Sequence, residues 1–162
     1  MNNSLHRTNW IIDVVEECSD MLLRVAFSYM KNISDAEDMV NSAFLKLMER
    51  NPSFENDEHK KAWLIRVTIN LCKNRLKTAW FRKVIPLEDN NLSFLPEENI
   101  TISAVLELPE KYRSIILLYY YDGYSIKEIA YILEAKESTI SSRLQRARKQ
   151  LKSKLMEDFD YE

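Results

Sequence analysis

The sequence contains very little glycine, proline, cysteine or histidine, and each shortage excludes a class of fold or site. One glycine, Gly123, and four prolines leave little material for the tight turns of β-hairpins, so we expect an all-α fold. Two cysteines and two histidines without metal-ligand spacing argue against a zinc site. A Gly-rich phosphate loop and a histidine near a nucleophile are also missing, so we expect neither an enzyme nor a cofactor.

The sequence also lacks a long apolar run. Its first residues, MNNSLHRTNW, contain neither an apolar core nor a small-residue cleavage site, so we expect no signal peptide and no membrane span. Cys18 and Cys72 fall on apolar stripes and are expected to be buried thiols. We therefore predict a cytoplasmic protein.

Charge is distributed unevenly, although the net charge is only −2. Acidic residues dominate between positions 13 and 58, whereas positions 66–83 carry basic residues and no acid. Positions 136–154 are again basic, with Glu137 as their one acid. Two separate basic segments in a mildly acidic protein indicate two nucleic-acid contacts.

Positions 124–155 predict two helices joined by a tight turn, the geometry of a DNA-binding helix-turn-helix. Ser125 and Glu128 have the spacing of a capping box that starts the first helix. The second helix carries one apolar stripe, formed by Ile140, Leu144, Ala147, Leu151 and Leu155. Hydroxyls, an amide and cations outside this stripe can bond base edges and phosphates, although a solvated basic surface would look the same. The predicted DNA contacts of this helix are Ser138, Thr139, Ser141, Ser142, Arg143, Gln145, Arg146 and Lys149.

Helical periodicity also predicts three helices in the first half of the chain, over about 10–31, 34–50 and 60–80. Ser34 and Glu37 have the spacing of a second capping box, and Pro52 ends the second helix. Positions 83–100 have no clear periodicity and predict an extended linker. A short helix over 101–107 follows, and Pro109 suits the first position of the next helix. We thus expect two small helical domains, 8–82 and 101–156, joined by the linker 83–100.

Two stretches resemble one protein family. LPEKYRSIILLYYYDGYSIKEIAYILEAKESTISSRLQRARKQL is similar to the C-terminal DNA-binding domain of bacterial sigma factors of the extracytoplasmic-function group. DAEDMVNSAFLKLMERNPSF, followed by AWLIRVTINLCKNRLK, resembles their N-terminal core domain. The resemblance implies an RNA polymerase sigma factor that binds core polymerase, recognises −10 and −35 promoter DNA and directs transcription initiation. Whether an anti-sigma factor also binds is left open.

The resemblance assigns residues to these roles. The acidic helix over 35–49 matches the polymerase-docking segment, with the contact set Asp35, Asp38, Asn41, Ser42 and Lys46. The third helix matches the −10 reader, with the contact set Arg66, Asn70, Lys73, Asn74 and Lys77. Asn70 corresponds to a position beside the pocket for a flipped base, and the loop 54–60 would form the pocket wall. Trp80 and Phe81 are candidates for base stacking, and they could equally pack the end of the domain.

One residue departs from the family pattern, and one alternative function remains. Glu134 stands in the turn of the helix-turn-helix where the family commonly has glycine. Because a left-handed backbone is costly without glycine, we expect a slightly different turn there. The alternative to a sigma factor is a helix-turn-helix regulator that binds duplex DNA without polymerase, usually as a dimer.

Overall fold

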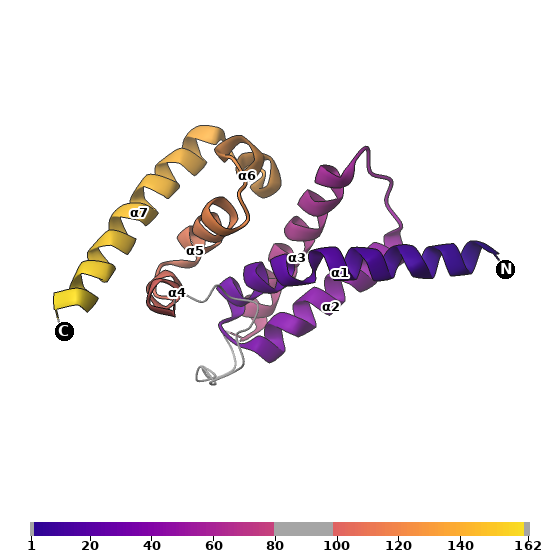
Figure 1. Cartoon of the computed structure of the whole chain (residues 1–162), viewed down its shortest axis with the longest axis horizontal. Helices are drawn as coiled ribbons and strands as arrows, with labels where there is room; N and C mark the ends of the chain where they lie inside the picture. The colour runs from indigo at the N-terminus through magenta and orange to yellow at the C-terminus, as the bar shows by residue number, and fades with distance from the viewer. Residues whose placement is uncertain (1, 80–98, 161–162) are drawn as a thin grey trace.

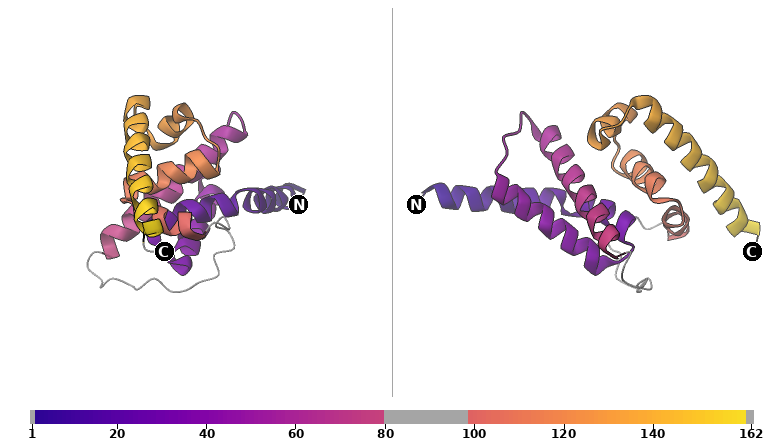
Figure 2. Two further views of the ribbon diagram at one scale, coloured as in Figure 1. Left: turned by 60° about the vertical axis from the view of Figure 1, so that its left-hand side comes forward. Right: turned by 180° about the vertical axis from the view of Figure 1, so that it is seen from behind.

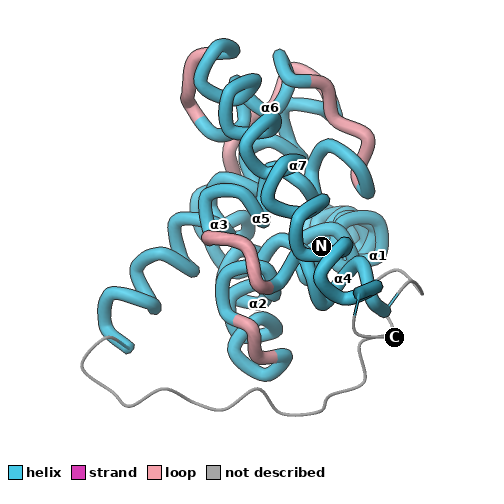
Figure 3. Tube along the Cα trace, turned by 90° about the vertical axis from the view of Figure 1, so that its left-hand side faces the viewer, coloured by secondary structure: helices cyan, strands magenta, loops and turns pink. Residues whose placement is uncertain are grey.

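The structure, a computed structural model, describes residues 2–79 and 99–160. Within these ranges it contains helices and turns and no strand, as predicted (Figure 3). Almost all of the predicted linker 83–100, together with Trp80 and Phe81, lies outside the described residues. No helix in the described ranges is long and apolar enough to cross a membrane.

The N-terminal unit consists of three helices, α1 (Asn2–Met30), α2 (Ile33–Arg50) and α3 (Asp57–Ala79), each packed against the other two (Figure 1). Its core includes Leu22 from α1, Leu47 from α2 and Ile65 from α3, none of which is exposed to solvent. Cys18 and Cys72 are free thiols buried in this core, as predicted. Burial, followed by the nearby charge of Glu110, raises the pKa of the Cys72 thiol to about 12.

All three helix starts in this unit differ from the predictions, and α1 begins at Asn2, eight residues before its predicted start near residue 10. Asn32, and not Ser34, caps α2: its side-chain oxygen accepts a hydrogen bond from the amide of Asp35 at 2.9 Å. The predicted capping box at Ser34 is therefore wrong, because the left-handed Lys31 (φ 55°) places an extended asparagine ahead of the helix. In the same way, Asn56 accepts from the amide of His59 at 2.9 Å and starts α3 at Asp57. The second half of the predicted loop 54–60 is thus helical.

The C-terminal unit contains α4 (Asn99–Leu106), α5 (Glu110–Ile116), the π-helical turn η1 (Leu117–Tyr121), α6 (Ile126–Leu133) and α7 (Glu137–Asp160). Pro109 is the residue before α5 and not its first residue. The capping box at Ser125 and Glu128 is confirmed, with both of its hydrogen bonds at 3.1 Å. Ile140, Leu144 and Ala147 of the predicted stripe are buried, while Leu151 and Leu155 are partly buried.

The two units pack directly against each other: α1 contacts α5 and η1, and α3 contacts α6 (Figure 2). Their buried side chains form one continuous hydrophobic core. Arg24 of α1 reaches Asp122 at the end of η1, with 2.6 Å between Nη2 and Oδ1. Arg113 of α5 is 6% exposed and donates from Nε to the carbonyl of Ser28 near the end of α1. Such buried polar contacts fix how the units sit on one another.

Candidate nucleic-acid and polymerase interfaces

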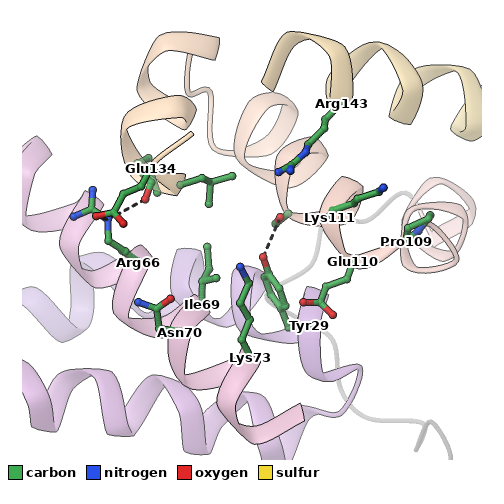
Figure 4. A pocket seen from close by; sticks show the side chains of 13 residues that line it. Tyr29, Arg66, Ile69, Asn70, Lys73, Pro109, Glu110, Lys111, Glu134 and Arg143 are labelled. Atoms are coloured by element: carbon green, nitrogen blue, oxygen red, sulfur yellow. Dashed lines mark hydrogen bonds and ion pairs between the residues drawn. The ribbon is translucent and has the colours of Figure 1, made fainter. Parts of the chain in front are cut away.

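The exposed face of α7 carries most of the residues predicted to contact DNA. Arg146, Ser142 and Lys149 are exposed and lie opposite the buried side of the helix that contains Ile140. Ser138 and Gln145 are exposed beside them, and Thr139 and Ser141 are half-buried. The predicted residue that lies apart is Arg143, which points toward α3 (Figure 4). The structure therefore gathers seven of the eight predicted residues outside the helix packing face.

The turn between α6 and α7 contradicts the prediction made for Glu134. This residue adopts the left-handed conformation that glycine usually supplies, with φ 54° and ψ 44°. The turn therefore has the backbone conformation usual at a helix end. Glutamate adopts that conformation at a higher free energy than glycine would. The amide of Ala135 then donates to the carbonyl of Ala130 at 2.9 Å, and the amide of Glu134 donates to the same carbonyl.

The predicted −10 residues lie together on one stripe of α3. Arg66, Asn70, Lys73 and Lys77 follow one another at helical spacing, with Asn74 beside them. All except Arg66 are exposed, and Arg66 is half-buried. We call these five residues the α3 stripe. Cations spaced along a helix in this way can follow a phosphate backbone.

Part of the α3 stripe lines a pocket of about 450 Å³ between the two units (Figure 4). Arg66, Asn70 and Lys73 line it from the α3 side, and Arg143 and Lys111 line it from the C-terminal unit. Like charges therefore face each other across the pocket. Two carboxylates on its wall, Glu110 and Glu134, reduce their repulsion.

Arg66 spans this pocket and ends on α6. Its Nε donates to the carbonyl of Ile132 at 3.1 Å, and its Nη2 donates to the carbonyl of Tyr131 at 2.9 Å. These carbonyls belong to the last turn of α6, where the helix dipole is negative. The Tyr131 carbonyl also accepts from the amide of Glu134 at 3.3 Å. The guanidinium also lies 3.4 Å from a carboxylate oxygen of Glu134 and 5.4 Å from the centre of the Tyr131 ring.

The predicted polymerase-docking residues lie on the outer side of α2. Asp38 and Asn41 are exposed, and Asp35, Ser42 and Lys46 flank them and are half-buried. Arg75 of α3 approaches Asp35 at 3.5 Å and Asp38 at 4.0 Å, so the acidic set borders the basic helix.

The prediction missed two apolar residues on this face of α2. Leu45 is 56% exposed and Met48 is 47% exposed, and both share a stripe with Asp38 and Asn41. A leucine in the middle of an otherwise polar face was the available signal. An exposed apolar pair rimmed by polar residues is typical of a protein-binding surface.

The chain is similar to known proteins along most of its length. Residues 14–82 match the family described as sigma-70 region 2, and residues 99–151 match sigma-70 region 4. The chain is 31% identical over 141 residues to the ECF RNA polymerase sigma-E factor of Escherichia coli K12, which covers 75% of this chain and 74% of that protein. It is 25% identical over 163 residues to the ECF RNA polymerase sigma factor SigW of Bacillus subtilis, covering 88% and 87%.

The fold is also similar to a solved structure. The sigma factor RpoE, in its co-crystal structure with the anti-sigma factor NepR from Bartonella quintana, superposes with a TM-score of 0.69 at 24% sequence identity. The match covers 89% of this chain and 97% of that one.

Proposed function

This chain belongs to the extracytoplasmic-function group of the sigma-70 family, the sigma factors of bacterial RNA polymerase, and we propose that α2, α3 and α7 divide its recognition tasks. As a sigma factor it recognises promoters and directs transcription initiation. Sigma factors act by binding, and we assign the same non-enzymatic mode of action to this chain, in the cytoplasm where polymerase works. The polymerase-independent regulator is not favoured, because residues 14–82 match a sigma region of their own.

We assign −35 recognition to the exposed face of α7. Ser142 and Arg146 lie at its centre, where side chains reach base edges when a recognition helix enters the major groove. Lys149 lies further along and would neutralise phosphate. The capped start of α6 and the buried stripe of α7 support this assignment, because they hold the recognition helix rigidly on the C-terminal unit.

We assign −10 recognition to the α3 stripe. Asn70 can read the edge of an unstacked base through its amide, and Lys73 and Lys77 would follow the strand. The loop 51–56 and the first turn of α3 lie at the amino end of the same helix. In this proposal they form the wall of the pocket for the unstacked base. The predicted wall segment 54–60 is therefore retained, and its second half belongs to α3.

We assign docking on core polymerase to the outer face of α2. Leu45 and Met48 supply apolar contact area, and Asp38 and Asn41 supply polar contacts at the rim. The proposed division of the chain is 8–82 for polymerase and −10 contacts, 83–100 as a linker whose last two residues already belong to α4, and 101–156 for −35 contacts. An anti-sigma factor remains a further expected partner.

The observation that carries the proposal is that each basic face belongs to a different matched sigma region. The test is run-off transcription with purified core polymerase on fragments of genomic DNA from the source bacterium. Discrete transcripts should require both the polymerase and this chain. If the chain binds specific duplex sites and yields no discrete transcripts with polymerase, it is a regulator of the alternative class.

Asn70→Ala tests the −10 assignment more narrowly. We expect it to impair strand opening or −10 selectivity more than docking on the −35 element, because the amide would contact only an unstacked base. Permanganate footprinting of the open complex measures this on the promoters found by run-off transcription. Unchanged thymine reactivity together with unchanged −10 preference would remove Asn70 from the reading set.

A further inference from the structure

Arg66 is held by the C-terminal unit through the same guanidinium that our proposed function directs at promoter DNA. Its two nitrogens donate to the carbonyls of Tyr131 and Ile132, and Glu134 lies within ion-pair distance. We propose that Arg66 and the carboxyl end of α6 form a clasp, which occupies the Arg66 guanidinium and holds the C-terminal unit opposite Asn70 and Lys73 in the free chain, and which must release before promoter DNA binds. This inference rests on the assignment of α3 to the −10 element.

The first argument is competition for one side chain. A guanidinium forked onto two main-chain carbonyls has its donors directed at those carbonyls and cannot form the same bonds with phosphate. Asn70 and Lys73 next to it line a pocket of about 450 Å³ that the C-terminal unit borders on the other side. A pocket of this size suits a small molecule and is too small for a DNA strand running along α3.

The second argument is the length of the promoter. The names of the −10 and −35 elements place them about 25 base pairs apart, which is roughly 85 Å of duplex at about 3.4 Å per base pair. In the closed chain, α3 contacts α6, the first helix of the helix-turn-helix, directly. The two reading faces therefore cannot occupy both elements until the interface between the units opens.

The third argument is the presence of Glu134 at a left-handed position. A glycine would adopt φ 54° without strain, so the family pattern would cost this turn nothing. Strained residues persist where another interaction compensates for them. Here the glutamate carboxylate is 3.4 Å from Arg66, and glycine could not provide that charge. The departure from glycine thus falls at the residue that faces Arg66.

Distance measurements test whether the free chain is closed. Spin labels can be placed on exposed positions of the two units through Ser53→Cys and Ser153→Cys, because the native thiols are buried. We expect one narrow distance distribution for the otherwise unchanged chain. Glu134→Lys keeps a non-glycine residue in the turn and sets like charges together, so longer distances should appear. A broad distribution before substitution, or none of the longer distances in Glu134→Lys, overturns the clasp.

Nucleic-acid affinity tests whether the clasp competes with DNA. An apparent affinity falls in proportion to the fraction of competent molecules, so a weaker clasp must tighten binding. For a fluorescent oligothymidylate we expect about tenfold tighter binding by Arg66→Lys, which keeps the cation and loses the fork. Glu134→Gly should tighten binding by about twofold to fivefold. Glu107→Gln is the matched control, because its ion pair with Lys154, at 3.3 Å against 3.4 Å for Glu134 and Arg66, lies within the C-terminal unit.

The two measurements separate failure of the clasp from failure of the proposed function. If Glu134→Lys opens the chain but neither the clasp variants nor Lys73→Ala change oligothymidylate binding, the clasp stands and the assignment of α3 to DNA is wrong. If Lys73→Ala weakens binding and the clasp variants bind as the unchanged chain does, the assignment of α3 stands and the clasp is overturned.

Discussion

Arginine serves two different purposes in this chain, and its burial distinguishes them. Arg113 is buried and Arg66 half-buried, and both donate to main-chain carbonyls of the opposite unit. Arg146 is exposed on α7, where the helix core is on the other side. The first use ties two helical units together by satisfying carbonyls at helix ends. The second leaves the guanidinium available for a guanine edge or a phosphate.

Substitution of Arg146 should distinguish recognition of −35 bases from contacts with the DNA phosphates. We expect Arg146→Ala to cost roughly 1–3 kcal/mol of promoter binding and to relax preference at particular −35 positions, because arginine pairs with guanine in the major groove. Lys152→Ala, further along α7, should weaken all sequences alike and reduce the salt slope by about one unit. A promoter library transcribed with each mutant holoenzyme measures both effects.

Equal losses on every promoter for Arg146→Ala would identify Arg146 as a phosphate contact only. The reading residues would then have to be Ser138, Ser141 or Gln145. Lys152→Ala serves as the internal control in that experiment, since it removes one cation from the same helix.

Substitution of Glu134 should reveal the cost of its left-handed backbone. Glu134→Gly and Glu134→Ala both remove the ion pair with Arg66, but only glycine relieves φ 54°. We therefore expect Glu134→Gly to be more stable than Glu134→Ala by about 1 kcal/mol. Urea unfolding of the two variants under identical conditions measures the difference directly. Equal stabilities would mean that the turn relaxes around alanine and that the strain is smaller than its dihedral angles imply.

The outer surface of α2 carries exposed apolar side chains beside polar ones, as a surface for a protein partner does. Charge reversal of Asp38 combined with Asn41→Arg should weaken binding to core polymerase without unfolding the chain, because exposed substitutions usually cost less than about 0.5 kcal/mol. Leu45→Ala should weaken binding further, since the leucine lies in the middle of the same face and is 56% exposed. Co-purification with core polymerase measures the association.

The control for α2 is charge reversal at Asp13, an exposed acid on α1. Charge reversal at Asp13 should leave polymerase binding unchanged if binding depends on charge on α2 and not on the net charge of the chain. A folded Asp38 and Asn41 double variant with full polymerase affinity would show that docking uses another face.

Helices and their buried stripes could be predicted from the sequence, because helical periodicity depends on side chains close together in the chain. The stripe at Ile140 and the capping box at Ser125 are examples of this. Helix starts were less predictable. Asn32 caps α2 because Lys31 adopts a left-handed backbone conformation, and no local sequence pattern predicts that conformation. The candidate site residues on α3 and α7 were chosen through motifs, and they lie on the helices predicted for them. Their contacts with DNA stay a prediction.

The packing of the two units could not be predicted from the sequence. Arg66 donates to main-chain carbonyls of α6. Because every residue type has such a carbonyl, the sequence does not indicate which residues Arg66 contacts. Glu134 was recognised as unusual, but its ion pair spans 68 positions of sequence and depends on how α3 meets α6. Such contacts become visible only when both units are placed in space.

At the scale of the whole molecule, polar contacts inside an apolar interface hold the two units together. Arg24 and Asp122 pair at 2.6 Å, and the Asp122 side chain is only 4% exposed. Burial raises the pKa of the Asp122 carboxyl above its usual range, and the neighbouring Arg24 opposes that shift. Its second oxygen, Oδ2, receives no hydrogen bond from any described residue. The carboxylate therefore depends on Arg24 for its compensation.

Removal of Arg24 should destabilise the whole chain through this carboxylate. We expect Arg24→Met to lower the free energy of unfolding by about 3 kcal/mol at pH 7, because it leaves a buried charge without its partner. Asp122→Asn should cost less than about 1 kcal/mol, since it removes the buried charge itself and leaves the half-buried arginine to reach solvent. Denaturant unfolding of both variants beside the unchanged chain measures the two losses.

The pH dependence of the Arg24→Met loss distinguishes charge from packing. A buried carboxyl with a raised folded pKa contributes most stability when protonated, and that contribution is lost as pH rises from the unfolded value of about 3.9 through the folded value. Without Arg24 only burial acts on Asp122, so its folded pKa should rise further. The deficit of Arg24→Met relative to the unchanged chain should therefore shrink between pH 7 and pH 5. An equal deficit at both values would assign the loss to the packed alkyl stem of Arg24 and not to the charge of Asp122.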